Sequence, residues 1–150
     1  MRDEIIWAAG FIDGEGSILL HRAKSRRHGH GVRHQPTIVV GQTTREPLEI
    51  LARLFGGSIY LRAQQRPRCR PVYAWGIRGG KAVRTALTAL LPYLIVKKAE
   101  AELILSFCAA MRPQGGQAPL SPAEIDARGQ IADQLTALKR AGRGELVSNA

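Results

Sequence analysis

The sequence is short of acidic residues and of cysteine, and it contains no long apolar run. Its 150 residues include 12 Asp plus Glu against 22 Lys plus Arg, a net charge of +10, so the natural ligand is a polyanion such as a nucleic acid. Two cysteines, Cys69 and Cys108, cannot form a disulfide framework, which favours a reducing intracellular compartment. No run approaches the roughly 18 apolar residues of a membrane span, so no membrane partner is expected.

The stretch from Trp7 to Ser17, W-A-A-G-F-I-D-G-E-G-S, is the most informative in the chain. It predicts a helix that is apolar on all sides, and a chain of this size has room for about one core, so part of the helix needs a partner. Gly10 supports this view, because glycine costs a helix roughly 1 kcal/mol relative to alanine and therefore suggests a close approach between backbones. The expected contacts with a second copy of the chain are Ile6, Ala9, Gly10 and Asp13.

Two acids, Asp13 and Glu15, stand where this helix is expected to end. Acids are unfavourable at the negative end of a helix dipole, so a purely structural role is the weaker interpretation. Carboxylate and carbonyl oxygens together are the ligands that Mg²⁺ prefers. The pattern predicts that the Glu15 carboxylate and the Gly14 carbonyl bind Mg²⁺, whereas Asp13 either takes part or only caps and orients.

Residues Ala8 to Gly16, A-A-G-F-I-D-G-E-G, resemble the signature of the LAGLIDADG homing endonucleases, with alanine for the first leucine and glutamate for the last aspartate. The resemblance implies an intron-encoded meganuclease, a metal-dependent hydrolase that cuts double-stranded DNA at a specific site. Because the motif occurs once, it implies a homodimer and a long, roughly palindromic site. It also implies that Gln42, Arg45 and Lys97 surround the metal, where Gln42 orders water and the two cations stabilise phosphate charge or assist proton transfer.

The order of helix-like and strand-like segments predicts an α+β fold, with helices on one face of an antiparallel sheet and the other face free for a ligand. The resemblance implies an αββαββα core whose saddle-shaped sheet lies over the DNA major groove. We expect this core over residues 1–112, a linker over 113–120, and a C-terminal helix and tail over 121–150 that begin with a capping box at Ser121 and Glu124. The expected elements are a helix that ends at Gly16, strands 17–22 and 37–42 joined by a loop, a helix over 47–56, strands 58–63 and 72–78 joined by an arginine-rich loop, and helices over 83–91, 97–111 and 122–139.

DNA contacts are expected on the free face of the sheet, since alternate strand residues point to opposite faces. Arg62 and Gln64 suit guanine and adenine edges in the major groove. The expected free-face residues are Ser17, Leu19, His21, Thr37, Val39, Tyr60, Arg62 and Gln64, and the expected covered residues are Ile18, Leu20, Ile38, Val40, Ile59, Leu61, Tyr73, Trp75 and Ile77. The basic loop residues expected on phosphates are Lys24, Arg26, Arg27, Arg33, Arg66, Arg68 and Arg70.

Three alternatives stay open at this point. His28, His30 and His34 could bind zinc, but the lack of paired cysteines favours a solvated loop that faces DNA. A basic sheet could also bind intron RNA as a maturase. Finally, the scaffold could bind DNA without cutting it, although the intact acid at Glu15 argues against this.

Overall fold

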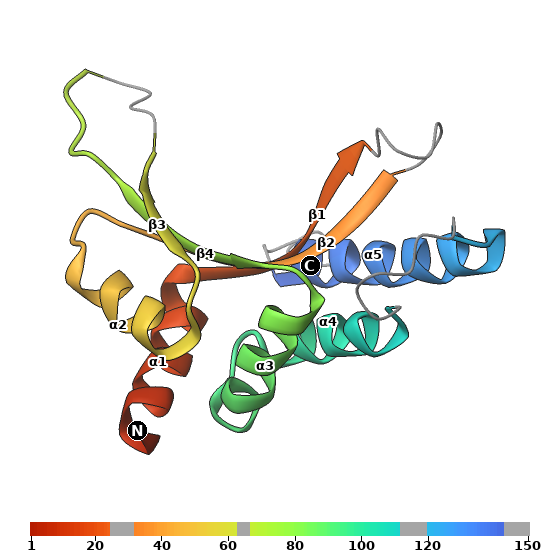
Figure 1. Cartoon of the computed structure of the whole chain (residues 1–150), viewed down its shortest axis with the longest axis horizontal. Coiled ribbons are helices and arrows are strands. Elements are labelled where there is room, and N and C mark those ends of the chain that lie inside the picture. Colours follow the sequence, from red (N-terminus) through yellow and green to blue (C-terminus); the bar gives the residue numbers. More distant parts are fainter. Residues whose placement is uncertain (25–31, 63–66, 112–119, 143–150) are drawn as a thin grey trace, which may run out of the picture.

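Within the residues that the structure describes, 1–24, 32–62, 67–111 and 120–142, four strands form one antiparallel sheet with helices on a single face (Figure 1). The structure is a computed structural model, and its strand order is β1-β2-β4-β3. The expected α+β class and αββαββα order are confirmed. The elements are α1 (Arg2–Glu15), β1 (Gly16–Lys24), β2 (Val32–Gln42), α2 (Glu46–Phe55), β3 (Ser58–Leu61), β4 (Tyr73–Arg78), α3 (Gly80–Leu90), the 3-10 helix η1 (Leu91–Tyr93), α4 (Lys98–Ala110) and α5 (Pro122–Gly142).

Helix α1 has one buried side and one exposed apolar side. Ala8, Ala9 and Ile12 are fully buried in the core, whereas Ile6 and Trp7 remain 43% and 38% exposed. The expectation that Ala9 faces a second copy is therefore wrong, because its own chain already covers it completely. The side of α1 that is open to a partner is instead the one that carries Ile6, Trp7 and Gly10.

The hairpin of β1 and β2 is longer than predicted. Residues 32–36 belong to β2, although their proline and charged neighbours favoured a loop. Pro36 has no N–H to donate, and its position in the strand tolerates this. Its carbonyl accepts the Gly79 N–H at 2.9 Å, so its nitrogen faces the same side, where β4 has already ended at Arg78. Beyond this point β1 and β2 pair only with each other.

The covered face of the sheet forms the core. Ile18, Ile38 and Trp75 lie on three strands and are fully buried beneath the helices. Trp75 Nε1 donates to the Gly56 carbonyl at 2.8 Å, which attaches the end of α2 to the sheet. Leu61 pairs with Tyr73 on the covered side as predicted, but it is not covered: it is 59% exposed at the end of the edge strand β3.

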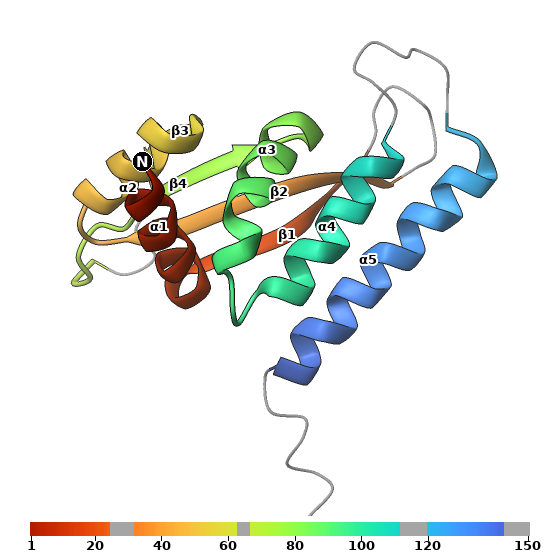
Figure 2. The same ribbon diagram turned by 90° about the horizontal axis from the view of Figure 1, so that it is seen from below.

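Helix α5 lies along α4 and adds to the same core (Figure 2). The capping box predicted at its start is confirmed: the Glu124 N–H donates to Ser121 Oγ at 3.2 Å, and the Ser121 N–H donates to Glu124 Oε2 at 2.7 Å. Leu135 is only 4% exposed, and Lys139 pairs with Glu100 at 3.8 Å. Most of the predicted linker lies outside the described residues, so the division into core, linker and tail stays a prediction.

The free face of the sheet is concave. The β1–β2 end and the β3–β4 end both rise away from the helices, which is the saddle shape that the resemblance implied (Figure 1). None of the helices in the described part of the chain is both long and apolar enough to cross a membrane.

Candidate functional site

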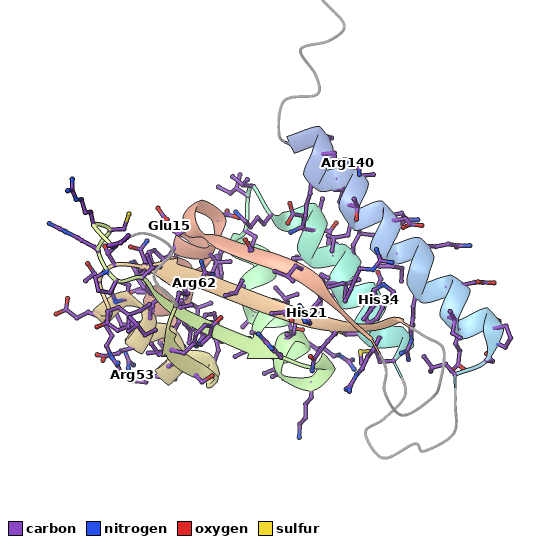
Figure 3. The ribbon with its side chains drawn as sticks, turned by 90° about the horizontal axis from the view of Figure 1, so that it is seen from above. Glu15, His21, His34, Arg53, Arg62 and Arg140 are labelled. Atoms are coloured by element: carbon purple, nitrogen blue, oxygen red, sulfur yellow. The ribbon has the colours of Figure 1, made fainter. Side chains whose placement is uncertain are left out.

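Glu15 is the last residue of α1 and stands exposed where the chain passes directly into β1 (Figure 3). Gly16 permits this turn, because a Cβ there would lie only 2.9 Å from the Ile12 carbonyl oxygen, to which the Gly16 N–H already donates. Gly14 is also exposed, and a Cβ built on it would meet no described atom within 4 Å. The turn therefore presents the Glu15 carboxylate to open space at one end of the sheet.

Asp13 ties this turn to a distant part of the chain. Its carboxylate accepts the backbone N–H groups of Ile95 at 2.7 Å, Val96 at 3.2 Å and Lys97 at 2.9 Å. These groups precede α4, so the carboxylate stabilises the positive end of that helix. Asp13 is thus engaged within its own chain as an internal cap, and its contact with a second copy stays a prediction.

Lys97 is brought to the motif by the same arrangement. Its ammonium group donates to the backbone carbonyl of Asp13, two residues before Glu15. The structure therefore places Lys97 beside the α1–β1 turn, as the resemblance implied, although Lys97 lies 82 positions after Glu15 in the chain. Its catalytic role stays a prediction.

Gln42 and Arg45 follow the end of β2. Gln42 is half-buried and lies two residues beyond Val40, the register partner of Gly16, so it is at the same end of the sheet as Glu15. Arg45 is engaged elsewhere: its Nε donates to Glu49 at 2.8 Å, and its guanidinium lies 5.8 Å from the Tyr73 ring centroid. The structure supports the placement of Gln42 more directly than that of Arg45.

The concave face carries the side chains that alternation assigned to it. Leu19, His21, Val39, Tyr60 and Arg62 line one open groove of about 700 Å³ across all four strands. Thr37 lines the same groove but is only 4% exposed, and its hydroxyl donates to the Gln35 carbonyl at 3.1 Å. Thr37 therefore shapes the groove rather than offering a free donor to a base. Ser17, half-buried, pairs with Val39 on the same face.

Sequence reasoning missed half of the residues that line this groove: Gly57, Ser58, Gly76, Ile77, Arg78 and Ala82. The signal was present for Gly76 and Arg78, because placing Trp75 and Ile77 on the covered side requires their neighbours 76 and 78 to face the groove. Arg78 adds a cation opposite Thr37, in the middle of the sheet.

The basic residues expected on phosphates are only partly described. Arg33, Arg68 and Arg70 are exposed, as a phosphate contact requires. Lys24 is the last residue of β1. Arg26, Arg27, Gln64 and Arg66 lie outside the described residues, as does the side chain of Lys24.

His34 does not belong to a solvated loop that faces DNA. It lies in β2 on the covered side, half-buried, with its ring 6.4 Å from that of Phe107 in α4. Burial lowers the pKa of His34, and the nearby Arg22 and Arg128 lower it further, whereas Asp133 raises it. His28 and His30 lie outside the described residues, and no group of three or more His, Cys, Asp or Glu in the described part of the chain could hold a metal ion.

These features define a class of protein. A basic, saddle-shaped sheet with an acid-bearing helix end at its rim suits a protein that binds a nucleic acid in the groove and cuts its backbone at the rim. The model of the LAGLIDADG endonuclease family matches residues 8–101, which is more than half of the chain. The chain therefore belongs to the LAGLIDADG endonuclease family, and the prediction of a DNA endonuclease is confirmed.

Solved structures of other proteins share the fold. The homing endonuclease I-CvuI, solved with a DNA target in the presence of Mg, is 24% identical, with a TM-score of 0.74 over 91% of this chain and 82% of that one. The archaeal intron-encoded I-Vdi141I, solved with DNA, is 22% identical, with a TM-score of 0.73 over 91% of this chain and 84% of that one. The meganuclease I-SmaMI is 19% identical, with a TM-score of 0.66 over 85% of this chain and 42% of that one. The comparison with curated proteins gave no match.

Proposed function

We propose that this endonuclease acts as a homodimer that cuts both strands of a long, roughly palindromic DNA site with the help of Mg²⁺. The observation that carries the proposal is the α1–β1 turn, which presents the exposed Glu15 at one end of the sheet whose open face forms the groove. A net charge of +10 favours the DNA backbone as the ligand.

The exposed side of α1 supports the homodimer. Ile6 and Trp7 are apolar and exposed, and a Cβ on Gly10 would meet no described atom within 4 Å, so a second helix can approach closely. Ile95 and Val96, held at Asp13, are 85% and 73% exposed and extend this apolar surface. The chain covers 82% of I-CvuI but only 42% of I-SmaMI, so it supplies one unit where the longer protein has room for two.

The donor set fits Mg²⁺ if two copies share it. One chain offers the Glu15 carboxylate and the Gly14 carbonyl at the turn, and no described cluster of three ligating side chains surrounds them. Mg²⁺ keeps several waters and is usually bound by one or two carboxylates together with substrate phosphates. Glu15 from each copy and the DNA phosphates would complete such a site.

The residues around the turn have distinct tasks in this proposal. When bound, Mg²⁺ would activate water and stabilise the leaving oxygen. Glu15 holds negative charge at the turn, Lys97 brings a cation to the same turn through its contact with the Asp13 carbonyl, and the Gln42 amide orients water at the same end of the sheet. Arg45 can stabilise phosphate charge only if its ion pair with Glu49 breaks.

The length of the site follows from the strands. The nine residues of β1, at about 3.3 Å each, span roughly 30 Å, or about nine base pairs at 3.4 Å each. Two copies related by a two-fold axis would therefore cover about 20 base pairs in two similar half-sites.

The test is to incubate purified protein with a library of long random duplexes, with Mg²⁺ or with EDTA. The proposal predicts double-strand cuts at one defined sequence with Mg²⁺ and none with EDTA. Absence of metal-dependent cuts under all conditions would contradict it. Tight binding of structured intron RNA without any DNA cut would instead identify a maturase.

The expected reducing intracellular location is part of the same proposal, supported by the use of only two cysteines.

A further inference from the structure

The side chain of Arg62 lies across the sheet. Arg62 follows β3, where its N–H donates to the Val72 carbonyl at 2.8 Å. A Cβ built on Gly41, in β2, would lie 3.2 Å from Arg62 Nη1 and 3.5 Å from Arg62 Cζ. Because β4 separates β3 from β2, the guanidinium reaches over a whole strand to arrive at Gly41.

The residues of the concave face beneath the Arg62 side chain are small. Gly41 and Tyr60 are both register partners of Ala74, so these three residues form one row across the concave face. Ala74 is fully buried although it lies on the open side of the sheet. Val72 Cγ1 would lie 3.6 Å from a Cβ on Gly41. The missing side chain at position 41 therefore leaves the space in which the Arg62 guanidinium rests.

This resting place has a definite position in the groove. Gly41 follows Val40, the register partner of Gly16, so the guanidinium lies at the end of the sheet that carries Glu15, whereas His21 lies farther along (Figure 3). An arginine reads guanine through two parallel hydrogen bonds, and this fork must be held in orientation to select one base. A side chain that lies flat across the sheet has less rotational freedom to lose on binding than one that extends into solvent.

We propose that Gly41 is a positioning residue for DNA recognition, which seats Arg62 so that its guanidinium reads one base pair in the inner part of each half-site. The inference rests on the proposed function, because it requires that the groove binds DNA. It assigns a task to a residue that itself offers no side chain to the ligand.

The experiment compares Gly41→Ala with Gly129→Ala. Gly129 lies in α5, away from the concave face, and a Cβ there would meet no described atom within 4 Å. Binding to a library of half-site variants is measured in EDTA, so cleavage plays no part. Arg62→Ala and the double variant Gly41→Ala/Arg62→Ala complete a cycle that isolates the interaction between the two residues.

Arg62→Ala should remove a preference for guanine at one inner position, which a bidentate pair makes about five-fold to about 150-fold. Gly41→Ala should weaken or move that same preference, and Gly129→Ala should leave it unchanged. Once Arg62 is absent, Gly41→Ala should have no further effect. The inference is overturned if Gly41→Ala leaves the preference unchanged, or if Gly41→Ala has the same effect with and without Arg62. In either case, selective binding by the wild-type protein would still uphold the proposed function. Wild-type protein that binds all library members equally would overturn both.

Discussion

The two ends of the sheet are built in different ways. At the α1–β1 end, backbone contacts hold the functional residues: three N–H groups converge on Asp13, and Gly16 packs against the Ile12 carbonyl. At the other end, β1 and β2 continue past the end of β4 as a two-stranded ribbon, with exposed side chains such as His21. Bond cleavage requires groups that are fixed to a fraction of an ångström, whereas recognition of a long site requires many exchangeable side chains. Under the proposed function, the groups for cleavage lie at the α1–β1 end, whereas the recognition surface runs from Arg62 near that end to the ribbon.

The sharpest test of this division is Glu15→Gln at the fixed end. Removing the carboxylate should lower the rate of DNA cutting by a factor on the order of 10²–10³ or more, because a charge that organises the reaction is lost. Binding of the target in EDTA should persist, since the concave face is untouched. Glu102→Gln, at an exposed position of α4, is the control and should cut normally. Joint loss of cutting and binding would show that Glu15 is architectural.

Gly10→Leu tests whether the fixed end depends on a second copy. The space around Gly10 is open within one chain, so leucine should leave the fold intact, and it is the better helix former by nearly 1 kcal/mol. At a close helix contact it should weaken the dimer about five-fold to about 150-fold, since overpacking costs about 1–3 kcal/mol. Sedimentation velocity measures the change, with Gly129→Leu on α5 as the control, because Gly129 is likewise open. A variant that remains dimeric would refute this interface.

Asp13→Ala tests how the fixed end is held. Loss of a charged cap with three backbone hydrogen bonds should lower the free energy of unfolding by about 1–3 kcal/mol, and Asp13→Asn by less. Cutting should slow because Lys97 loses its anchor, while DNA binding persists. Urea unfolding and hydrogen exchange at residues 95–97 measure the effect, with the exposed Asp126→Ala as the control. Dissociation of the dimer with unchanged exchange at 95–97 would place Asp13 at the interface.

The smallest effect is expected at the other end, from His34. Burial lowers the pKa of His34 in the folded chain, so the unfolded chain, with an ordinary value near 6.5, binds the proton more readily. Stability from this residue is therefore present above about pH 6.5 and is lost as the pH falls toward the lower folded pKa. Thermal unfolding between pH 7.5 and 5.5 should show this loss, and His34→Gln should reduce it. Equal slopes in wild type and His34→Gln would disprove the assignment.

Much of this architecture could be predicted because it depends on local pattern. Period-two alternation placed Leu19, Val39 and Arg62 in the groove, and the capping box placed the start of α5 at Pro122. The spacing around Ala9 was ambiguous: Ile5, Ala8, Ala9 and Ile12 follow the i, i+3, i+4, i+7 spacing of one helix face, but the other side of the helix is apolar as well. Only the neighbouring elements, however, show which face of such a helix the core takes.

By itself, the sequence determined the class of fold, the position of the acid-bearing turn and the basic character of the surface, since periodicity, glycine placement and charge are properties of short segments. Tertiary structure alone decided that Asp13 caps a helix more than 80 residues away, that residues 32–36 extend β2, that His34 faces Phe107, and that Arg62 rests on Gly41. Each of these depends on which distant segments become neighbours. That choice is made by packing of the whole core, and no local pattern encodes it.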